Sequence, residues 1–390
     1  MSEEDLKEWP LWVTRNWELY REAPAQLRAD RDFLLVVLQE CPEALEHAAQ
    51  ELRADREVVL EAVKVDPLAL RFAAEAVRGD RAVAEEAVHK DWKALQYVAE
   101  GLREDRDLVL KAVKQDWAAL FFAGKSLKSD RKLVLEAVNA GSGLAVEHAS
   151  PEHRASKEVM LKAVEQTGIA LRAATPNLRR DREVVLKAVK QNGLALGYAD
   201  EALRADKEVV LEAVGQNGIA LSSAAMVLRA DRQVVMAAVG KSGMALEFAA
   251  ADAVDKEVVL AAVRQKGKAL KFGGAFRQLR EVVLEAVKQD GMALEFASEE
   301  LRSDSEVVST AAEQDPSAVS FGCGALTRVP KPVRLATAYR LLHHRGVEPV
   351  YQQKGITLDV RGQKFDEYAW LDEGTSVVEY PFQYLHPCPP

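Results

Sequence analysis

Two kinds of side chain recur at fixed positions in this chain, and each kind could contact a ligand. A row of rings could stack on nucleic-acid bases or anchor a peptide. A row of arginines could bind phosphates or carboxylates through planar guanidinium groups. The rings are His47, Phe72, Tyr97, Phe122, His148, Tyr198, Phe248, Phe272, Phe296 and Phe321, and Ala173 and Ser223 take the same position in two copies. The arginines are Arg28, Arg53, Arg78, Arg103, Arg179, Arg204, Arg229 and Arg302.

Both rows also have a structural interpretation, which is the simpler one. Aromatic residues at one fixed helical position are normally buried, so the rings could form a packed core between successive repeats. Each arginine stands near the end of an expected helix, where it could cover free carbonyl groups and pair with an Asp two residues later.

The elements that position these rows form an internal repeat. The segment Asp-Arg-Glu-Val-Val-Leu-Glu-Ala-Val begins at Asp55, and close copies follow at intervals of mostly 25 residues. Two degenerate copies begin near Ser156 and Leu279. A fixed period of this length indicates stacked repeats. We therefore expect an all-α fold, an α-solenoid or superhelix of about twelve 25-residue helix-turn-helix repeats over residues 30–329.

Each repeat carries its own start and stop signals. Asp55 can cap the free amides of a first helix, and Val58, Val59 and Ala62 lie on one apolar face of it. The helix then stops at a glycine that could adopt positive φ, as at Gly193, or at a proline or tryptophan in other copies. We expect a second, continuous short helix after this stop. Its apolar face is formed by Ala69, Leu70, Ala73 and Val77.

Two positions of the second helix are small in nearly every copy, as at Ala69 and Ala73, which predicts close helix packing. The residue just before the ring varies freely, which indicates exposure. We expect the most informative of these variable residues to form a partner-binding surface, with ordinary solvated surface as the alternative. These candidates are Arg71, Gln96, Phe121, Glu147, Arg172, Glu247, Lys271 and Glu295.

Composition bears on the class of partner. The chain has 390 residues and a net charge of −9, which weighs against nucleic-acid binding. Its three cysteines are too far apart for a disulfide framework or a zinc site, which favours an intracellular, cytoplasmic location. The acidic start does not resemble a signal peptide, and no apolar run is long enough to span a membrane. We expect no membrane insertion, no cofactor and no metal.

The two ends differ from the repeats. Residues 1–29 contain Trp9, Trp12, Trp17 and Tyr20, and we expect them to form a helical cap over the first repeat, with an exposed aromatic docking peptide as the alternative. Residues 330–390 are expected to form a cap helix, closed by Gly346, and a small β appendage. Its first strand is expected at residues 355–360, before a turn at 361–362, and further strands at 367–371 and 376–380. The pair Gly273-Gly274 interrupts one repeat. It could form a functional cleft in the surface, or it could result from neutral sequence drift.

The repeat resembles a known family. The block Asp-Arg-Glu-Val-Val-Leu-Glu-Ala-Val-Lys-Gln-Asp-Gly-Met-Ala-Leu-Glu-Phe-Ala-Ser-Glu-Glu-Leu-Arg looks like the repeat called domain of unknown function 4116. The best copies are residues 279–302 and 181–204. This resemblance implies an all-helical repeat array and no particular activity. The period is also similar, more weakly, to the leucine-rich-repeat variant, a short-period helical solenoid.

No catalytic motif accompanies the repeat. The sequence has no phosphate-binding glycine loop after a strand, no Gly-x-Ser-x-Gly elbow and no His-Glu-x-x-His helix. We therefore expect a non-catalytic protein-binding scaffold, or a structural subunit, rather than an enzyme. One alternative is a single-stranded nucleic-acid-binding repeat protein. Another is a regulatory or accessory subunit of an enzyme complex that docks through its C-terminal β segment.

Overall fold

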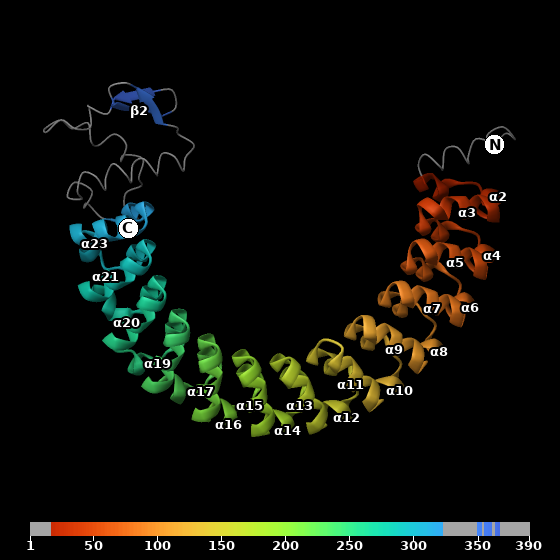
Figure 1. The fold of residues 1–390 in the computed structure, drawn as a ribbon, viewed down its shortest axis with the longest axis horizontal. Helices are drawn as coiled ribbons and strands as arrows, with labels where there is room; N and C mark the ends of the chain where they lie inside the picture. Colours follow the sequence, from red (N-terminus) through yellow and green to blue (C-terminus); the bar gives the residue numbers. More distant parts are fainter. Residues whose placement is uncertain (1–16, 323–348, 353–354, 361–362, 367–390) are drawn as a thin grey trace. The chain divides into compact units, whose positions relative to one another are not determined.

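The computed structural model describes residues 17–322, 349–352, 355–360 and 363–366 (Figure 1). The chain divides into two compact units, Met1–Gln191 and Asn192–Pro390. Both units are built from the same three-part repeat, and the described residues contain twelve long α helices, seven in the first unit and five in the second. The α-solenoid expected from the sequence is confirmed.

One repeat consists of a long α helix, a 3-10 helix and a short third helix. In the repeat that begins at Asp55 these are α5 (Arg56–Val65), η3 (Pro67–Phe72) and α6 (Glu75–Arg78). Within each unit, successive long helices pack side by side, and so do successive 3-10 helices.

The first unit begins with η1 (Trp17–Glu22) and α2 (Ala25–Arg28). Its other long helices are α3 (Arg31–Glu40), α7 (Arg81–Lys90), α9 (Arg106–Gln115), α11 (Arg131–Asn139), α13 (Lys157–Gln166) and α15 (Arg182–Gln191). Its other 3-10 helices are η2 (Pro42–His47), η4 (Trp92–Gln96), η5 (Trp117–Phe122), η6 (Gly143–His148) and η7 (Gly168–Ala173). Its other short helices are α4 (Gln50–Arg53), α8 (Glu100–Arg103), α10 (Lys125–Lys128), α12 (Pro151–Arg154) and α14 (Pro176–Arg179).

The second unit continues the pattern. Its long helices are α17 (Lys207–Gln216), α19 (Arg232–Lys241), α20 (Lys256–Gln265), α21 (Arg280–Gln289) and α23 (Ser305–Gln314). Its main 3-10 helices are η8 (Gly193–Tyr198), η9 (Gly218–Ser223), η10 (Gly243–Phe248), η12 (Gly267–Phe272), η14 (Gly291–Phe296) and η15 (Pro316–Phe321). The third elements are α16 (Glu201–Arg204), α18 (Met226–Arg229), η11 (Ala251–Ala253), η13 (Gly274–Gln278) and α22 (Glu299–Arg302).

The expectation of one continuous second helix is wrong, because the chain breaks after the ring position. Ala73 is extended, with φ −68° and ψ 151°, so the 3-10 helix ends there. This break frees the next amide, and Ala74 N–H donates to Arg53 O of the preceding repeat at 2.8 Å. A hydrogen bond between repeats therefore replaces the bond that would have continued the helix.

The core lies between the long helix and the 3-10 helix. Val58, Val59 and Ala62 are fully buried, and so are Ala69 and Leu70 on the 3-10 helix. Ala73 is 7% exposed although it lies outside a helix. The close packing predicted from the small residues is confirmed at these positions.

The stop position of the repeat is occupied by glycine for a different reason than expected. Among the described residues only Gly274 has positive φ, at 54°. At Gly267, an added Cβ would lie 2.5 Å from the carbonyl oxygen of Ala286 in the next long helix. Glycine is thus required by the close approach of two backbones, and the expectation based on positive φ is wrong at Gly193 and its equivalents.

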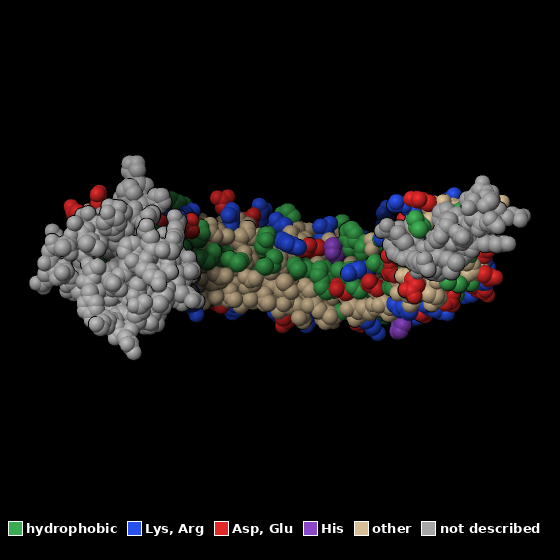
Figure 2. Space-filling view, turned by 90° about the horizontal axis from the view of Figure 1, so that it is seen from above, with side chains coloured by type: hydrophobic (Ala, Val, Ile, Leu, Met, Phe, Trp, Pro, Cys, Tyr) green, Lys and Arg blue, Asp and Glu red, His purple; other side chains and the backbone are tan. Residues whose placement is uncertain are grey.

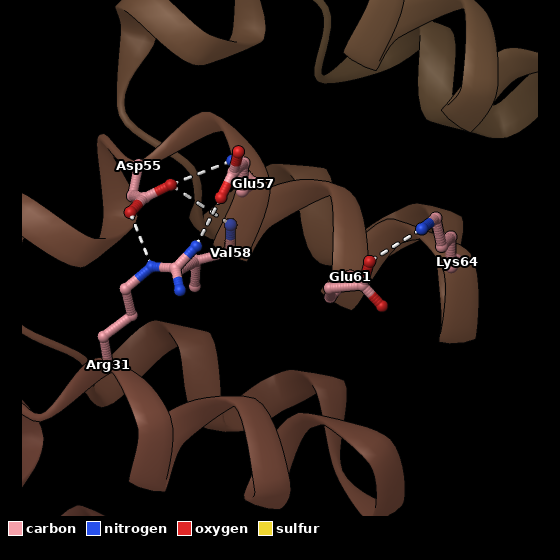
Figure 3. A network of polar contacts seen from close by, with 6 residues as sticks. All are labelled: Arg31, Asp55, Glu57, Val58, Glu61 and Lys64. Carbon is pink, nitrogen blue, oxygen red and sulfur yellow. Dashed lines mark hydrogen bonds and ion pairs between the residues drawn. The ribbon is translucent and has the colours of Figure 1, made fainter.

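The aspartates at the helix starts connect neighbouring repeats as well as capping their own helices (Figure 3). Asp55 Oδ1 accepts hydrogen bonds from the backbone N–H groups of Glu57 at 2.9 Å and Val58 at 3.3 Å, as the sequence predicts for an N-cap. Its Oδ2 accepts a hydrogen bond from Nε of Arg31, in the preceding repeat, at 3.2 Å. The same guanidinium donates to Glu57 at 2.5 Å.

This ion pair recurs through both units. In each case the basic residue at the start of one long helix pairs with the capping Asp of the next repeat. The pairs are Arg31–Asp55, Arg56–Asp80, Arg81–Asp105, Arg106–Asp130, Lys157–Asp181, Lys207–Asp231, Arg232–Asp255 and Arg280–Asp304. Where the capping Asp is missing, a glutamate of the next first turn takes its place, as in Arg131–Glu158 and Lys256–Glu281.

The described part of the N-terminal segment packs against the first repeat. Tyr20 is fully buried, its hydroxyl donates to Arg28 O at 3.3 Å, and its ring centroid lies 5.8 Å from that of Phe33. Trp9 and Trp12 lie outside the described residues. The boundaries of the N-terminal cap, the repeat array and the C-terminal segment remain predictions.

Three strands are described near the C-terminus: β1 (Pro349–Gln352), β2 (Gly355–Val360) and β3 (Gln363–Asp366). They form an antiparallel sheet in the order β1-β2-β3, with Val350 opposite Thr357 and Leu358 opposite Phe365. The strand expected at 355–360 coincides with β2. The cap helix expected within 330–346, the turn at 361–362 and the strands expected at 367–371 and 376–380 lie outside the described residues, so the complete appendage remains a prediction.

A candidate partner-binding surface

The variable residues predicted to form a binding surface all stand just before the last residue of a 3-10 helix or at its end. In the first unit Arg71, Phe121 and Arg172 are exposed, whereas Gln96 and Glu147 are half-buried. In the second unit Glu247, Lys271 and Glu295 are exposed. Because 3-10 helices of neighbouring repeats pack on one another, this position forms a surface row within each unit.

Two of the predicted residues contact each other. Arg172 Nη2 on η7 donates to Glu147 Oε2 on η6 at 2.8 Å, and Arg172 Nε donates to the other carboxylate oxygen. Other cations of the row lie against the neighbouring ring: the guanidinium carbon of Arg71 is 4.4 Å from the ring centroid of Phe72. These polar residues of the row thus contact a neighbouring residue of the row or the adjacent ring.

Phe121 departs from this pattern. It is a large apolar residue in a row of mostly polar residues, and it is 55% exposed. Its ring meets Phe122 edge-on, with centroids 5.0 Å apart, and His148 of the next repeat edge-on at 5.2 Å. Its outer part remains open to contact.

Tryptophans from neighbouring 3-10 helices complete a group of rings around Phe121. Trp117 stacks on His148 with centroids 6.0 Å apart and ring planes 14° apart. Trp92 lies 6.2 Å from Phe122. We call these five residues, from η4, η5 and η6, the aromatic cluster. The sequence shows both tryptophans at the stop position, which is Gly or Pro in the other copies, but it does not show that they join the rings.

The ring positions are half-buried and so match neither interpretation of them completely. Phe122, His148 and the equivalent rings of the other repeats all have intermediate exposure. Figure 2 shows apolar side chains next to basic and acidic side chains on the surface of the repeats. This surface offers apolar contact beside charged groups.

Lys128 lies beside Phe121, and in the described part of the chain no carboxylate forms an ion pair with it. Its Nζ donates to Phe121 O at 2.6 Å and lies 5.6 Å from the Phe121 ring centroid. Burial lowers the pKa of Lys128, nearby Arg103 lowers it further, and Glu104 partly offsets them. Burial also lowers the pKa of His148, Glu147 opposes this shift and Lys128 adds to it, which favours the neutral form of the ring stacked on Trp117.

Three of the eight recurrent arginines act as the structural interpretation predicts. Arg103 Nε donates to Val98 O at 2.8 Å, and Arg179 Nε donates to Ala174 O at 3.0 Å. Arg229 Nε bridges to Phe248 O of the next repeat at 2.6 Å. Carbonyl covering is confirmed at these three residues. In the other five the Nε atom is buried and has no hydrogen-bond partner among the described residues: Arg28, Arg53, Arg78, Arg204 and Arg302. The expected pairing with the Asp two residues later is wrong for Arg103, because Asp105 instead pairs with Arg81, which reaches it from the preceding repeat.

The described residues also bear on metal binding and membrane crossing. Within the described ranges no group of three or more His, Cys, Asp or Glu side chains could hold a metal ion. The same part of the chain has no helix of the length and apolar character that crossing a membrane requires.

The alternating α and 3-10 helices, joined by repeated polar contacts, define a helical-repeat protein. The chain belongs to the family described as Domain of unknown function (DUF4116). That family's model matches residues 30–78, 55–103, 80–128, 105–154, 130–179, 156–204, 181–226, 206–252 and 280–322. The suspected family resemblance is therefore confirmed. Comparison with curated proteins gives no match to this sequence.

Proposed function

We propose that this chain is a non-catalytic scaffold that binds another protein through the 3-10 helices of its first unit, with Phe121 at the centre of the contact. The observation that supports this most directly is the 55% exposure of Phe121 within the aromatic cluster. Aromatic side chains dominate the energetic centres of protein interfaces. The charged row around Phe121 corresponds to the polar rim of such an interface.

The frame behind the cluster is suited to this role. Phe121 contacts rings of two repeats, and its carbonyl oxygen accepts a hydrogen bond from Lys128. A side chain that is already ordered loses little conformational entropy when a partner binds. Extended repeat proteins use surfaces of this kind for binding.

Nucleic-acid binding is supported less well by the same surface. The Nε atoms of the recurrent arginines either donate to backbone carbonyl groups, as in Arg103 and Arg179, or are buried, as in Arg53, and the net charge of the chain is −9. We further infer an intracellular, cytoplasmic setting, because Cys41 is a free, buried cysteine and no disulfide framework is expected.

The proposal can be tested with Phe121→Gln, which introduces the residue type that the preceding repeat carries at Gln96. Affinity purification of the full chain from its own cells, read by mass spectrometry, should recover a protein that Phe121→Gln loses. Met226→Gln is the matched control, because Met226 is 65% exposed on α18 and lies outside the cluster. Recovery of the same proteins with all three chains would contradict the proposal.

A further inference from the structure

We propose that the partner segment bound at the aromatic cluster is an acidic peptide with one protruding apolar side chain. That side chain packs against Phe121 and His148, and a carboxylate of the peptide binds the ammonium of Lys128. This inference rests on the proposed function and adds the chemistry of the partner.

The apolar half of the site is the open part of Phe121. Its ring is in contact with Phe122 and His148, yet 55% of the residue is exposed. Covering the rest with an aliphatic or aromatic side chain removes apolar surface from water, which favours binding. His148 is held in place by its stack on Trp117 and offers a second ring to the same side chain.

The charged half is the uncompensated ammonium of Lys128. Among the described residues no carboxylate lies within ion-pair distance of its Nζ, which instead donates to Phe121 O. The two nearby glutamates are already engaged. Glu104 accepts hydrogen bonds from the Ser126 hydroxyl and from backbone amides at the start of α10, and Glu147 pairs with Arg172.

The surroundings make this ammonium receptive to an anion. Burial and the positive charge of Arg103 both disfavour the charged form of Lys128. A carboxylate relieves this repulsion and forms a charge-assisted hydrogen bond, which is stronger than a neutral one. A lysine or arginine in the partner would be repelled at the same place. Lys128 thus offers a positive charge that no carboxylate of the described residues pairs with, in a chain whose net charge is −9.

The test uses a random peptide library displayed on phage and panned against the full chain, with counter-selection on Phe121→Gln. We expect enriched sequences that combine one large apolar residue with an excess of Asp and Glu. Synthetic copies should bind Phe121→Gln at least about tenfold more weakly, as at an interface hot spot. They should bind Lys128→Met more weakly by about three- to tenfold, within the range of a typical hydrogen bond at a solvent-accessible site.

Three comparisons protect this test against trivial explanations. Lys128→Arg keeps the charge, and arginine occupies the equivalent position at Arg103, so this variant should retain binding. Met226→Gln should bind like the unaltered chain. Added salt should weaken binding to the unaltered chain more than binding to Lys128→Met.

The outcomes separate the two proposals. Phe121-dependent peptides without an acidic excess, or equal loss with Lys128→Arg and Lys128→Met, would overturn the acidic-peptide inference and leave the protein-binding function standing. Failure to enrich any Phe121-dependent peptide would also overturn the inference, whereas the protein-binding function stands or falls by the purification from cells. Binding of single-stranded RNA that requires both Phe121 and Lys128, in the absence of peptide binding, would overturn both.

Discussion

The side-chain oxygen Oε1 of Gln191 lies 2.6 Å from the backbone nitrogen of Gly168, one repeat earlier. Nε2 of the same glutamine donates to Gln166 O at 3.2 Å. The glutamine that ends one long helix thus satisfies both a donor and an acceptor at the turn of the preceding repeat. The second unit repeats this contact, for example from Gly193 N–H to Gln216 at 2.7 Å.

Removal of the Gln191 side chain, and with it these two hydrogen bonds, should destabilise the first unit. Gln191→Ala leaves the amide of the buried Gly168 without its acceptor, which costs about 1–3 kcal/mol. Urea unfolding at equilibrium measures the loss, and hydrogen exchange should show faster exchange at the Gly168 amide. The control is Gln166→Ala, because Gln166 occupies the same position one repeat earlier. In that repeat the Gly143 amide donates to Thr167 Oγ1 at 3.3 Å and does not depend on the glutamine. Equal destabilisation by the two variants would contradict this role.

The close approach at the stop position predicts opposite effects for two glycine substitutions. Gly267→Ala places Cβ 2.5 Å from Ala286 O, and the resulting overpacking should cost about 1–3 kcal/mol. Gly240→Ala, in the exposed part of α19, meets nothing within 4 Å and should stabilise by about 0.5–1 kcal/mol through helix propensity. Thermal or urea unfolding distinguishes them by sign. A neutral Gly267→Ala would show that the neighbouring helix shifts freely.

The capping aspartates should make stability depend on acid. The Val83 backbone N–H lowers the pKa of Asp80, burial opposes this shift, and Arg56 lowers the pKa further. Because the folded-state pKa lies below the unfolded value near 3.9, the stabilisation is present at neutral pH and is lost as the pH falls below about 4. Asp80→Ala should therefore cost about 1 kcal/mol at pH 7, and this difference should shrink in acid.

Urea unfolding of Asp80→Ala at pH 7 and pH 3 measures this dependence. Glu100→Ala serves as its control. It removes the carboxylate of an exposed residue whose side chain forms no hydrogen bond or ion pair with the residues that the structure describes. A cost for Asp80→Ala that is independent of pH would show that the cap acts without its charge.

Cys41 should resist thiol reagents in the folded protein. It is 2% exposed, and burial together with its hydrogen bond to Glu43 raises the pKa of the thiol to about 11. Since the thiolate is the reactive form, little of it is present at pH 8. In a chain carrying Cys323→Ser and Cys388→Ser, Ellman's reagent should react slowly until denaturant is added. Fast reaction of the folded chain would contradict the burial of Cys41.

The regular part of the fold follows from residues whose effect is local. The Asp caps, the valine pairs such as Val58 and Val59, and the period between them predict the number and spacing of the long helices, and the structure confirms them. The break at Ala73 could not be predicted in this way. It is stabilised by a hydrogen bond from Ala74 to Arg53, and that contact exists only after two repeats have packed.

The candidate surface was predictable in position but not in composition. A variable residue in a regular frame indicates exposure, and Phe121 and Arg172 are indeed exposed. The pairing of Arg172 with Glu147 and the stacking of Trp117 on His148 depend on how closely adjacent 3-10 helices approach. The sequence shows the individual side chains, whereas the distance between repeats decides which of them meet.

The recurrent polar contacts between repeats join the same two positions of the repeat in successive pairs of copies. Arg56 reaches forward to the Asp80 cap, and Gln191 reaches back to the Gly168 turn. Each copy carries its own set of donors and acceptors. When a copy is duplicated or deleted, the new contact between adjacent repeats therefore forms the same hydrogen bonds and ion pairs as the other contacts. Relatives of this chain can therefore lengthen or shorten during evolution by whole modules, without compensating substitutions at the new junction.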